Sequence, residues 1–186
     1  MEEPRFLSGQ FLLAMPGIGD PRFEKAVIAM CVHDDQGALG IGLGRIIPRI
    51  GFHDLLSQLD IDKGVAPDVA IHLGGPVEPQ RGFILHSLDW GGGDSIEVAG
   101  RWGLTATLDI LRAIAQGRGP SRWIAALGYA GWGAGQLEQE MCGNGWFATP
   151  GSDTLLYDCD VNSRWATAFQ SAGVDTRLLT ASFGTA

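Results

Sequence analysis

Two histidines and two carboxylates are the residues whose chemistry could support catalysis. His33 and His86 each end an apolar run that predicts a strand, while Asp20 lies in a loop and Glu138 in a predicted short helix. Histidine changes its charge near neutral pH, so a histidine beside a carboxylate could exchange protons with a substrate. The simpler interpretation is that each histidine caps backbone groups at a strand end or faces solvent. Both interpretations stay open at the level of sequence.

The usual catalytic and ligand-binding motifs are missing from the chain. There is no P-loop and no HExxH, and Thr180–Gly184 lacks the first glycine of a GxSxG elbow. The alternating glycines of the segment 40–44 lie inside a predicted strand, so they do not form a dinucleotide-binding turn. The cysteines are odd in number and without CxxC spacing, which favours reduced thiols in a cytoplasmic protein. The sequence therefore predicts no metal site and no cofactor.

Composition and charge narrow the class of protein further. The chain has 186 residues, of which 45% are hydrophobic and 18% charged, so we expect one domain spanning 1–186. The net charge of −8 argues against direct DNA binding, which draws most of its affinity from neutralised phosphates. The longest apolar runs, such as 26–32, are too short to span a membrane, and the acidic start lacks the features of a signal peptide. We therefore expect a cytoplasmic protein.

The stretch over 127–140 organises the predicted fold. An apolar run over 123–128 predicts a buried strand, which four glycines then interrupt around two aromatic residues. Glycine permits positive φ and close backbone approach, so we expect Gly131 or Gly133 to adopt a left-handed conformation. A short amphipathic helix is predicted to follow from Gln136.

The remaining pattern predicts short strands interrupted by a few helices. Strands are expected at 11–15, 26–33, 38–46, 69–73, 81–87, 95–99, 102–104 and 154–158. Helices are expected over 53–59 and after the N-caps Thr107 and Asn162, ending at Gly117 and Gly173. This order is typical of an α+β domain with mixed strand pairing.

A series of short motifs follows in a fixed order along nearly the whole chain. They are Leu13-Ala-Met-Pro16 with Asp20 and Phe23, His33 ahead of Gly37-Ala38, Leu73-Gly-Gly-Pro-Val77, Gly82-Phe-Ile-Leu-His86, Leu127-Gly-Tyr-Ala-Gly-Trp132 and Gly135-Gln-Leu-Glu138. In this order they resemble the AlgH/YqgE family of bacterial proteins. The resemblance implies a bifurcated sheet that includes a small closed barrel, flanked by helices. It also implies a cytosolic protein with a regulatory role, since the family carries a transcriptional-regulator label from exopolysaccharide production.

One position departs from the family pattern. Family members usually carry an Asn-Arg/Lys-Pro-like end to the strand that here ends Leu43-Gly-Arg-Ile-Ile-Pro48. Gly44 stands at the asparagine position, with Arg45 beside it. Any activity that depends on that amide is therefore in doubt in this chain.

The pattern favours a non-enzymatic binding protein that takes a small polar ligand or a partner peptide. We expect one pocket, formed by the loop 15–20, the turn 74–77 and the corner 132–136. No catalytic residue is assigned, and the candidate ligand-binding residues are Met15, Pro16, Asp20, His33, Gly75, Pro76, His86, Tyr129, Trp132, Gln136 and Glu138. The alternative is a hydrolase-like or nuclease-associated enzyme that uses His33 or His86 with Asp20 or Glu138. Direct sequence-specific DNA binding ranks third, because no helix-turn-helix pattern is present.

Overall fold

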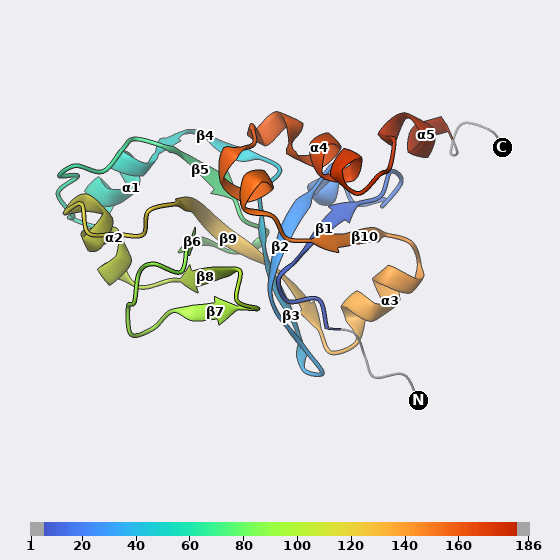
Figure 1. Ribbon diagram of the computed structural model, residues 1–186, viewed down its shortest axis with the longest axis horizontal. Helices are drawn as coiled ribbons and strands as arrows, with labels where there is room; N and C mark the ends of the chain where they lie inside the picture. The colour runs from blue at the N-terminus through green and yellow to red at the C-terminus, as the bar shows by residue number, and fades with distance from the viewer. Residues whose placement is uncertain (1–5, 182–186) are drawn as a thin grey trace.

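The computed structural model describes residues 6–181, which fold into a ten-stranded mixed sheet with helices around it (Figure 1). The strands are β1 (Gln10–Ala14), β2 (Val27–Asp34), β3 (Gly37–Gly42), β4 (Ile46–Gly51), β5 (Ala70–Leu73), β6 (Val77–His86), β7 (Ile96–Val98), β8 (Trp102–Thr105), β9 (Trp123–Gly133) and β10 (Trp146–Pro150). The α-helices are α1 (Phe52–Gln58), α2 (Leu108–Ala115), α3 (Gln136–Cys142), α4 (Arg164–Ser171) and α5 (Thr176–Ala181). The α+β class is confirmed.

Strand β9 is the point at which the sheet divides. It pairs antiparallel with β6 and parallel with β5 along its first half, and antiparallel with β3 along its second half. In Figure 1, β9 crosses the middle of the molecule, with α1 and α2 at one end and α3 at the other. The main path runs β10-β1-β2-β3-β9-β6-β8-β7, and β4 joins through β5. No ring of paired strands closes among the described residues, so the closed barrel is not confirmed.

The glycines after residue 127 bend β9 rather than end it, so the predicted strand is five residues too short. Gly128 has φ of 77°, and the register shifts around this point because extra residues of β6 lie between the pairs Val77–Tyr129 and Gly82–Leu127. A Cβ at Gly128 would lie 2.4 Å from the carbonyl oxygen of Gly75, so only glycine allows this approach. The prediction for Gly131 and Gly133 is wrong, because neither has positive φ; Gly128 and Gly135 carry the left-handed conformation instead.

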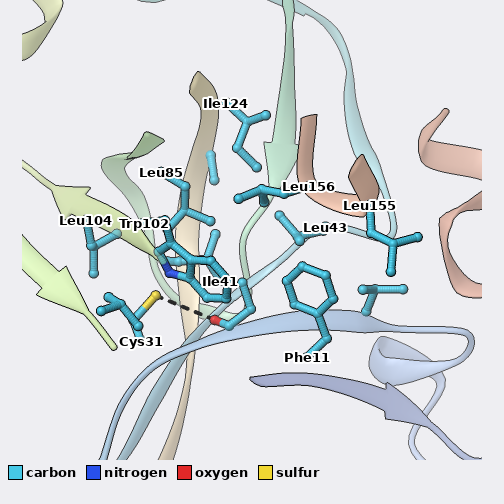
Figure 2. Close-up of a cluster of buried hydrophobic side chains, with 14 of the residues drawn as sticks. Phe11, Cys31, Ile41, Leu43, Leu85, Trp102, Leu104, Ile124, Leu155 and Leu156 are labelled. Atoms are coloured by element: carbon cyan, nitrogen blue, oxygen red, sulfur yellow. Dashed lines mark hydrogen bonds between the residues drawn. The ribbon is translucent and has the colours of Figure 1, made fainter. Parts of the chain in front are cut away.

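Alternation of side chains across the strands builds separate hydrophobic clusters on the two faces of the sheet. In β1, Phe11 and Leu13 face one cluster, while Leu12 and Ala14 face another. Figure 2 shows the first cluster, where Trp102 packs among strand residues and the C-terminal segment contributes leucines. The second cluster lies under α1 and α2, and β9 supplies side chains to every cluster. Strand β9, which contains the glycine-rich stretch, therefore connects the hydrophobic clusters of the core.

Several segments differ from the sequence-based expectation. Residues 154–158 form a π-helical turn instead of a strand, with Leu155 and Leu156 both buried. A short apolar run cannot distinguish a strand from a buried helical turn by periodicity. Conversely, β4 and β10 were not predicted, because Pro48 and Pro150 weaken the strand pattern of their segments.

The predicted helices are confirmed with small changes at their starts. Thr107 occupies the N-cap position of α2, although its side chain makes no capping hydrogen bond. Asn162 lies in a short 3-10 turn, and α4 begins two residues later. Among residues 6–181, no helix is both long enough and apolar enough to cross a lipid bilayer.

Candidate functional site

His33 and Glu138 are in direct contact although 105 positions separate them in the sequence. The Nε2 atom of His33 lies 2.6 Å from Oε1 of Glu138, and its Nδ1 atom accepts the backbone N–H of Leu7 at 2.9 Å. The second bond places the imidazole proton on Nε2, so the ring donates to the carboxylate. The histidine side chain is 2% exposed and the glutamate side chain 40%. Both ring nitrogens are thus occupied, and neither is free to take a proton from a substrate.

Glu138 stays ionised in this pairing. Burial opposes its ionisation, but hydrogen bonds from its own backbone N–H and from His33 outweigh that effect, so its pKa is lowered. The pair ties β2, the segment before β1 and α3 together. This structural contact is the simplest explanation for the positions of both side chains.

Among residues 6–181, no carboxylate is a hydrogen-bond partner of the His86 ring nitrogens. Its Nδ1 lies 2.8 Å from the carbonyl oxygen of Ser87, and its Nε2 lies 2.8 Å from Oγ1 of Thr105, which also contacts Ser95. Burial lowers the pKa of His86, so the neutral ring fits this interior position. His86 therefore closes a buried polar chain between β6 and β8 and does not reach Asp20 or Glu138.

A buried pair of His72 and Arg164 was not among the predicted site residues. Nη1 of Arg164 lies 3.1 Å from Nε2 of His72, whose Nδ1 contacts the carbonyl oxygen of Ala125 at 3.2 Å. Burial and the arginine charge lower the pKa of His72 to about 4, so the ring is neutral at physiological pH. Arg164 follows the polar residues Asn162 and Ser163 in the sequence, so residue type gave no signal for this site.

The loop 15–20 forms a hollow of its own, which we name the loop pocket. It has a volume of about 380 Å³, and Met15, Pro16 and Asp20 line it together with Trp165 of α4. The carboxylate of Asp20 pairs with Arg22 at 2.7 Å and accepts its backbone N–H, and these hydrogen bonds lower the pKa of Asp20. Asp20 is therefore already neutralised by a neighbour.

A second hollow, which we name the junction pocket, lies where β2, β3 and β5 meet beside β9. Its volume is about 280 Å³. Its lining is mainly apolar and glycine-rich, and consists of Arg22, Phe23, Ala26, Val27, Ile28, Gly42, Gly44, Arg45, Leu73, Gly74, Gly75, Pro76 and Ala130. Gly75 and Pro76 are thus the predicted site residues that line it.

The aromatic corner faces a third, shallow surface. Tyr129 and Trp132 border it with Val77, while the amide oxygen of Gln136 accepts the backbone N–H of Gly133 at 3.0 Å. The pKa of Tyr129 is raised by burial and by the nearby carboxylate of Glu78. The structure therefore distributes the predicted site over separate surfaces, and one pocket does not collect them.

Metal-binding and thiol chemistry have little support in the described part of the chain. Within residues 6–181, no cluster of three or more His, Cys, Asp or Glu side chains is arranged to hold a metal ion. Cys31, Cys142 and Cys159 are free cysteines. Burial raises the pKa of Cys31 to about 12, so this thiol is not a nucleophile at neutral pH.

Comparison with known proteins identifies the family. The model of the AlgH-like family matches residues 11–177, which include every strand of the sheet except the first residue of β1. The chain belongs to the AlgH-like family. Relatives named as UPF0301 proteins include one from Rhizorhabdus wittichii, 62% identical over 186 residues, and one from Novosphingobium aromaticivorans, 55% identical over 186 residues. Both alignments cover 100% of each chain.

Solved structures show the same AlgH-like fold. The solution structure of AlgH from Pseudomonas aeruginosa is 36% identical, with a TM-score of 0.80, and the match covers 100% of this chain and 99% of that one. A crystal structure from Corynebacterium diphtheriae gives a TM-score of 0.74 at 21% identity, covering 96% and 94% of the two chains. The second likeness concerns the fold alone.

Proposed function

We propose that this AlgH-like protein is a binding protein, not an enzyme, and that the junction pocket is its binding site. The observation that carries this proposal is the position of the pocket at the branch of the sheet. Four closely packed glycine backbones, those of Gly42, Gly74, Gly75 and Gly128, hold the strands together beside it. A rigid, mainly apolar hollow with a few polar groups is typical of small-molecule sites.

The state of the histidines supports a role without catalysis. His33, His72 and His86 each have both ring nitrogens within hydrogen-bond distance of a protein atom. A general base needs a nitrogen that can reach the substrate proton. None of these rings lines the junction pocket.

A thermal-shift screen of small metabolites tests the proposal. A ligand that binds the folded protein must raise its Tm. We expect Leu73→Trp, which places an indole at the pocket mouth, to abolish the shift. Leu88→Trp is the matched control, because Leu88 is similarly exposed and lies outside the pocket. If Leu73→Trp leaves every ligand-induced shift intact, the junction pocket is not the site.

A hydrolase-like enzyme is the second candidate, favoured by the contact of His33 with Glu138 at 2.6 Å. Release of the segment at Leu7 would free Nδ1 of His33 to act as a base. The test is a panel of ester and phosphoester substrates with the protein and its Glu138→Gln variant. Turnover that disappears in the variant would favour this candidate, whereas absence of turnover in both supports the binding role.

A cytoplasmic, regulatory role for the ligand-bound protein completes the proposal. It is supported by the AlgH-like family membership of residues 11–177. We also propose that 1–186 form one domain, because β9 supplies side chains to all of the hydrophobic clusters. We expect protein partners to recognise the ligand-bound state. Direct DNA binding is not expected, because the net charge of the chain is −8.

A further inference from the structure

The junction pocket carries positive charge at its edge and no negative charge. In the described part of the chain, Arg22 and Arg45 are the charged residues that line it, and no Asp or Glu does so. This is unusual in a chain with 21 acidic and 13 basic residues. Charge complementarity between a site and its ligand favours partners of opposite sign. The pocket therefore favours an anion.

The two arginines differ in how far their charge is already compensated. Arg22 pairs with the carboxylate of Asp20 at 2.7 Å. Arg45 makes no ion pair with any carboxylate among the described residues; its Nη2 atom donates to the carbonyl oxygens of Pro21 and Glu24 at 3.2 Å and 3.1 Å. Those two bonds use one nitrogen and hold the guanidinium in place. A guanidinium has five N–H donors, so most of them remain available to a ligand.

The walls of the pocket require an apolar body on the ligand. Phe23 and Pro76 contribute accessible hydrocarbon surface, and Leu73 stays 41% exposed at the edge. Burying such surface stabilises a complex by about 25 cal/mol per Å² of apolar area. A ligand that is only polar would leave these side chains in contact with water.

We propose that the junction pocket binds a medium-chain aliphatic carboxylate, with its chain against Phe23 and Leu73 and its carboxylate on Arg45. This inference rests on the proposed binding function and names the ligand class. A planar guanidinium matches a carboxylate in two parallel hydrogen bonds, which gives both affinity and orientation. The volume of about 280 Å³ suits a small ligand. Arg45 is thus the specificity-determining residue.

The experiment is a titration at low ionic strength with three probes, followed by amide chemical shifts. Octanoate has both the chain and the charge, 1-octanol has the chain alone, and butyrate has the charge with little chain. We expect saturable binding of octanoate with shifts at the amides of Gly44, Leu73 and Gly74. Octanol and butyrate are each expected to bind at least about tenfold more weakly, because octanol lacks the carboxylate and butyrate lacks most of the aliphatic chain.

Two arginine variants distinguish the effect of the positive charge in the pocket from the general effect of removing a positive charge from the protein. Arg45→Gln is expected to weaken octanoate binding about tenfold while leaving octanol binding unchanged. Arg49→Gln is the matched control, since Arg49 is exposed on β4 and does not line the pocket. Equal binding of octanoate and octanol, an unaffected Arg45→Gln variant, or no saturable binding of octanoate would each overturn the inference.

Failure of this inference is distinguishable from failure of the proposed function. If octanoate does not bind but Leu73→Trp blocks another ligand found in the metabolite screen, the pocket is a site for a different class. If Leu73→Trp blocks no ligand at all, both proposals fall together.

Discussion

Nη1 of Arg164 lies 3.1 Å from Nε2 of His72, so a buried cation is held by a neutral imidazole and not by an acid. The other donors of Arg164 reach the backbone carbonyls of Leu43, Leu155, Leu156 and Cys159. Arg164 is 3% exposed, and burial lowers its pKa. One side chain thereby attaches the C-terminal segment to the strands beside the junction pocket.

The first prediction is a loss of stability in mild acid that depends on His72. Its pKa is about 4 in the folded protein, against 6.5 for an unperturbed histidine, because burial and the arginine charge disfavour protonation. Between these values the unfolded chain binds more protons than the folded protein, so the free energy of unfolding decreases as the pH falls. The decrease between pH 7 and pH 4 is about 3 kcal/mol for this residue alone.

Urea denaturation of the protein and of His72→Gln at pH 7 and pH 4 measures this contribution. Glutamine does not titrate, so the variant should lose about 3 kcal/mol less than the parent over that interval. His86, whose pKa is also lowered by burial, contributes in the same direction in both proteins. Identical losses in parent and variant would show that His72 does not carry the effect.

The second prediction concerns Arg164 itself. Arg164→Ala leaves several buried carbonyl oxygens and one imidazole nitrogen without a donor, and should cost roughly 3 kcal/mol or more. The matched control is Arg112→Ala on α2, where the arginine is half exposed and lies 3.6 Å from Asp109. Exposed pairs of this kind contribute less than ~1 kcal/mol. Equal unfolding free energies for both variants would refute the anchoring role.

The third prediction tests the contact between His33 and Glu138. Glu138→Ala removes the acceptor of a buried imidazole N–H and should destabilise the protein by ~1 kcal/mol. Glu138→Gln keeps an amide oxygen at the same place, so its Tm should lie between that of the parent and that of Glu138→Ala. A Glu138→Ala variant with the Tm of the parent would mean that the contact adds no stability.

Local patterns in the sequence predicted more of the fold than of the site. The amphipathic spacing of α2 and α3 and the apolar runs of β1 and β2 were sufficient for those elements. The importance of the glycine-rich stretch was also evident, since β9 joins every cluster. The choice of strand partners was not, because β9 pairs with strands from distant parts of the chain.

The contacts that define the buried polar groups join residues far apart in sequence. His33 and Glu138 are separated by 105 residues, and His72 and Arg164 by 92. Residue types suggested histidine–carboxylate contacts but could not specify which of them the sheet would form. The pocket residues Gly42 and Leu73 read as ordinary strand residues, since their role depends on the branch of the sheet.

The last prediction ranks three glycines by the conformation that each adopts. Gly128 combines φ of 77° with a Cβ position 2.4 Å from the carbonyl oxygen of Gly75, so Gly128→Ala should cost at least ~2 kcal/mol. Gly135 has φ of 74° in open space, so Gly135→Ala should cost only the conformational term of ~1 kcal/mol. Gly133 has no positive φ, and a Cβ added there would have Oε1 of Gln136 as its nearest atom, at 3.9 Å.

Gly133→Ala should therefore leave stability unchanged or raise it by ~0.4–1 kcal/mol, because alanine has fewer unfolded conformations than glycine. Urea denaturation of the three variants under one condition gives the order directly. The expected order of destabilisation places Gly128→Ala first, Gly135→Ala second and Gly133→Ala last. If Gly133→Ala is the most damaging of the three, the bend in β9 lies at the aromatic corner and not at Gly128. The close backbone approach of Gly128 to Gly75 beside the junction pocket would then not be the main conformational constraint on β9.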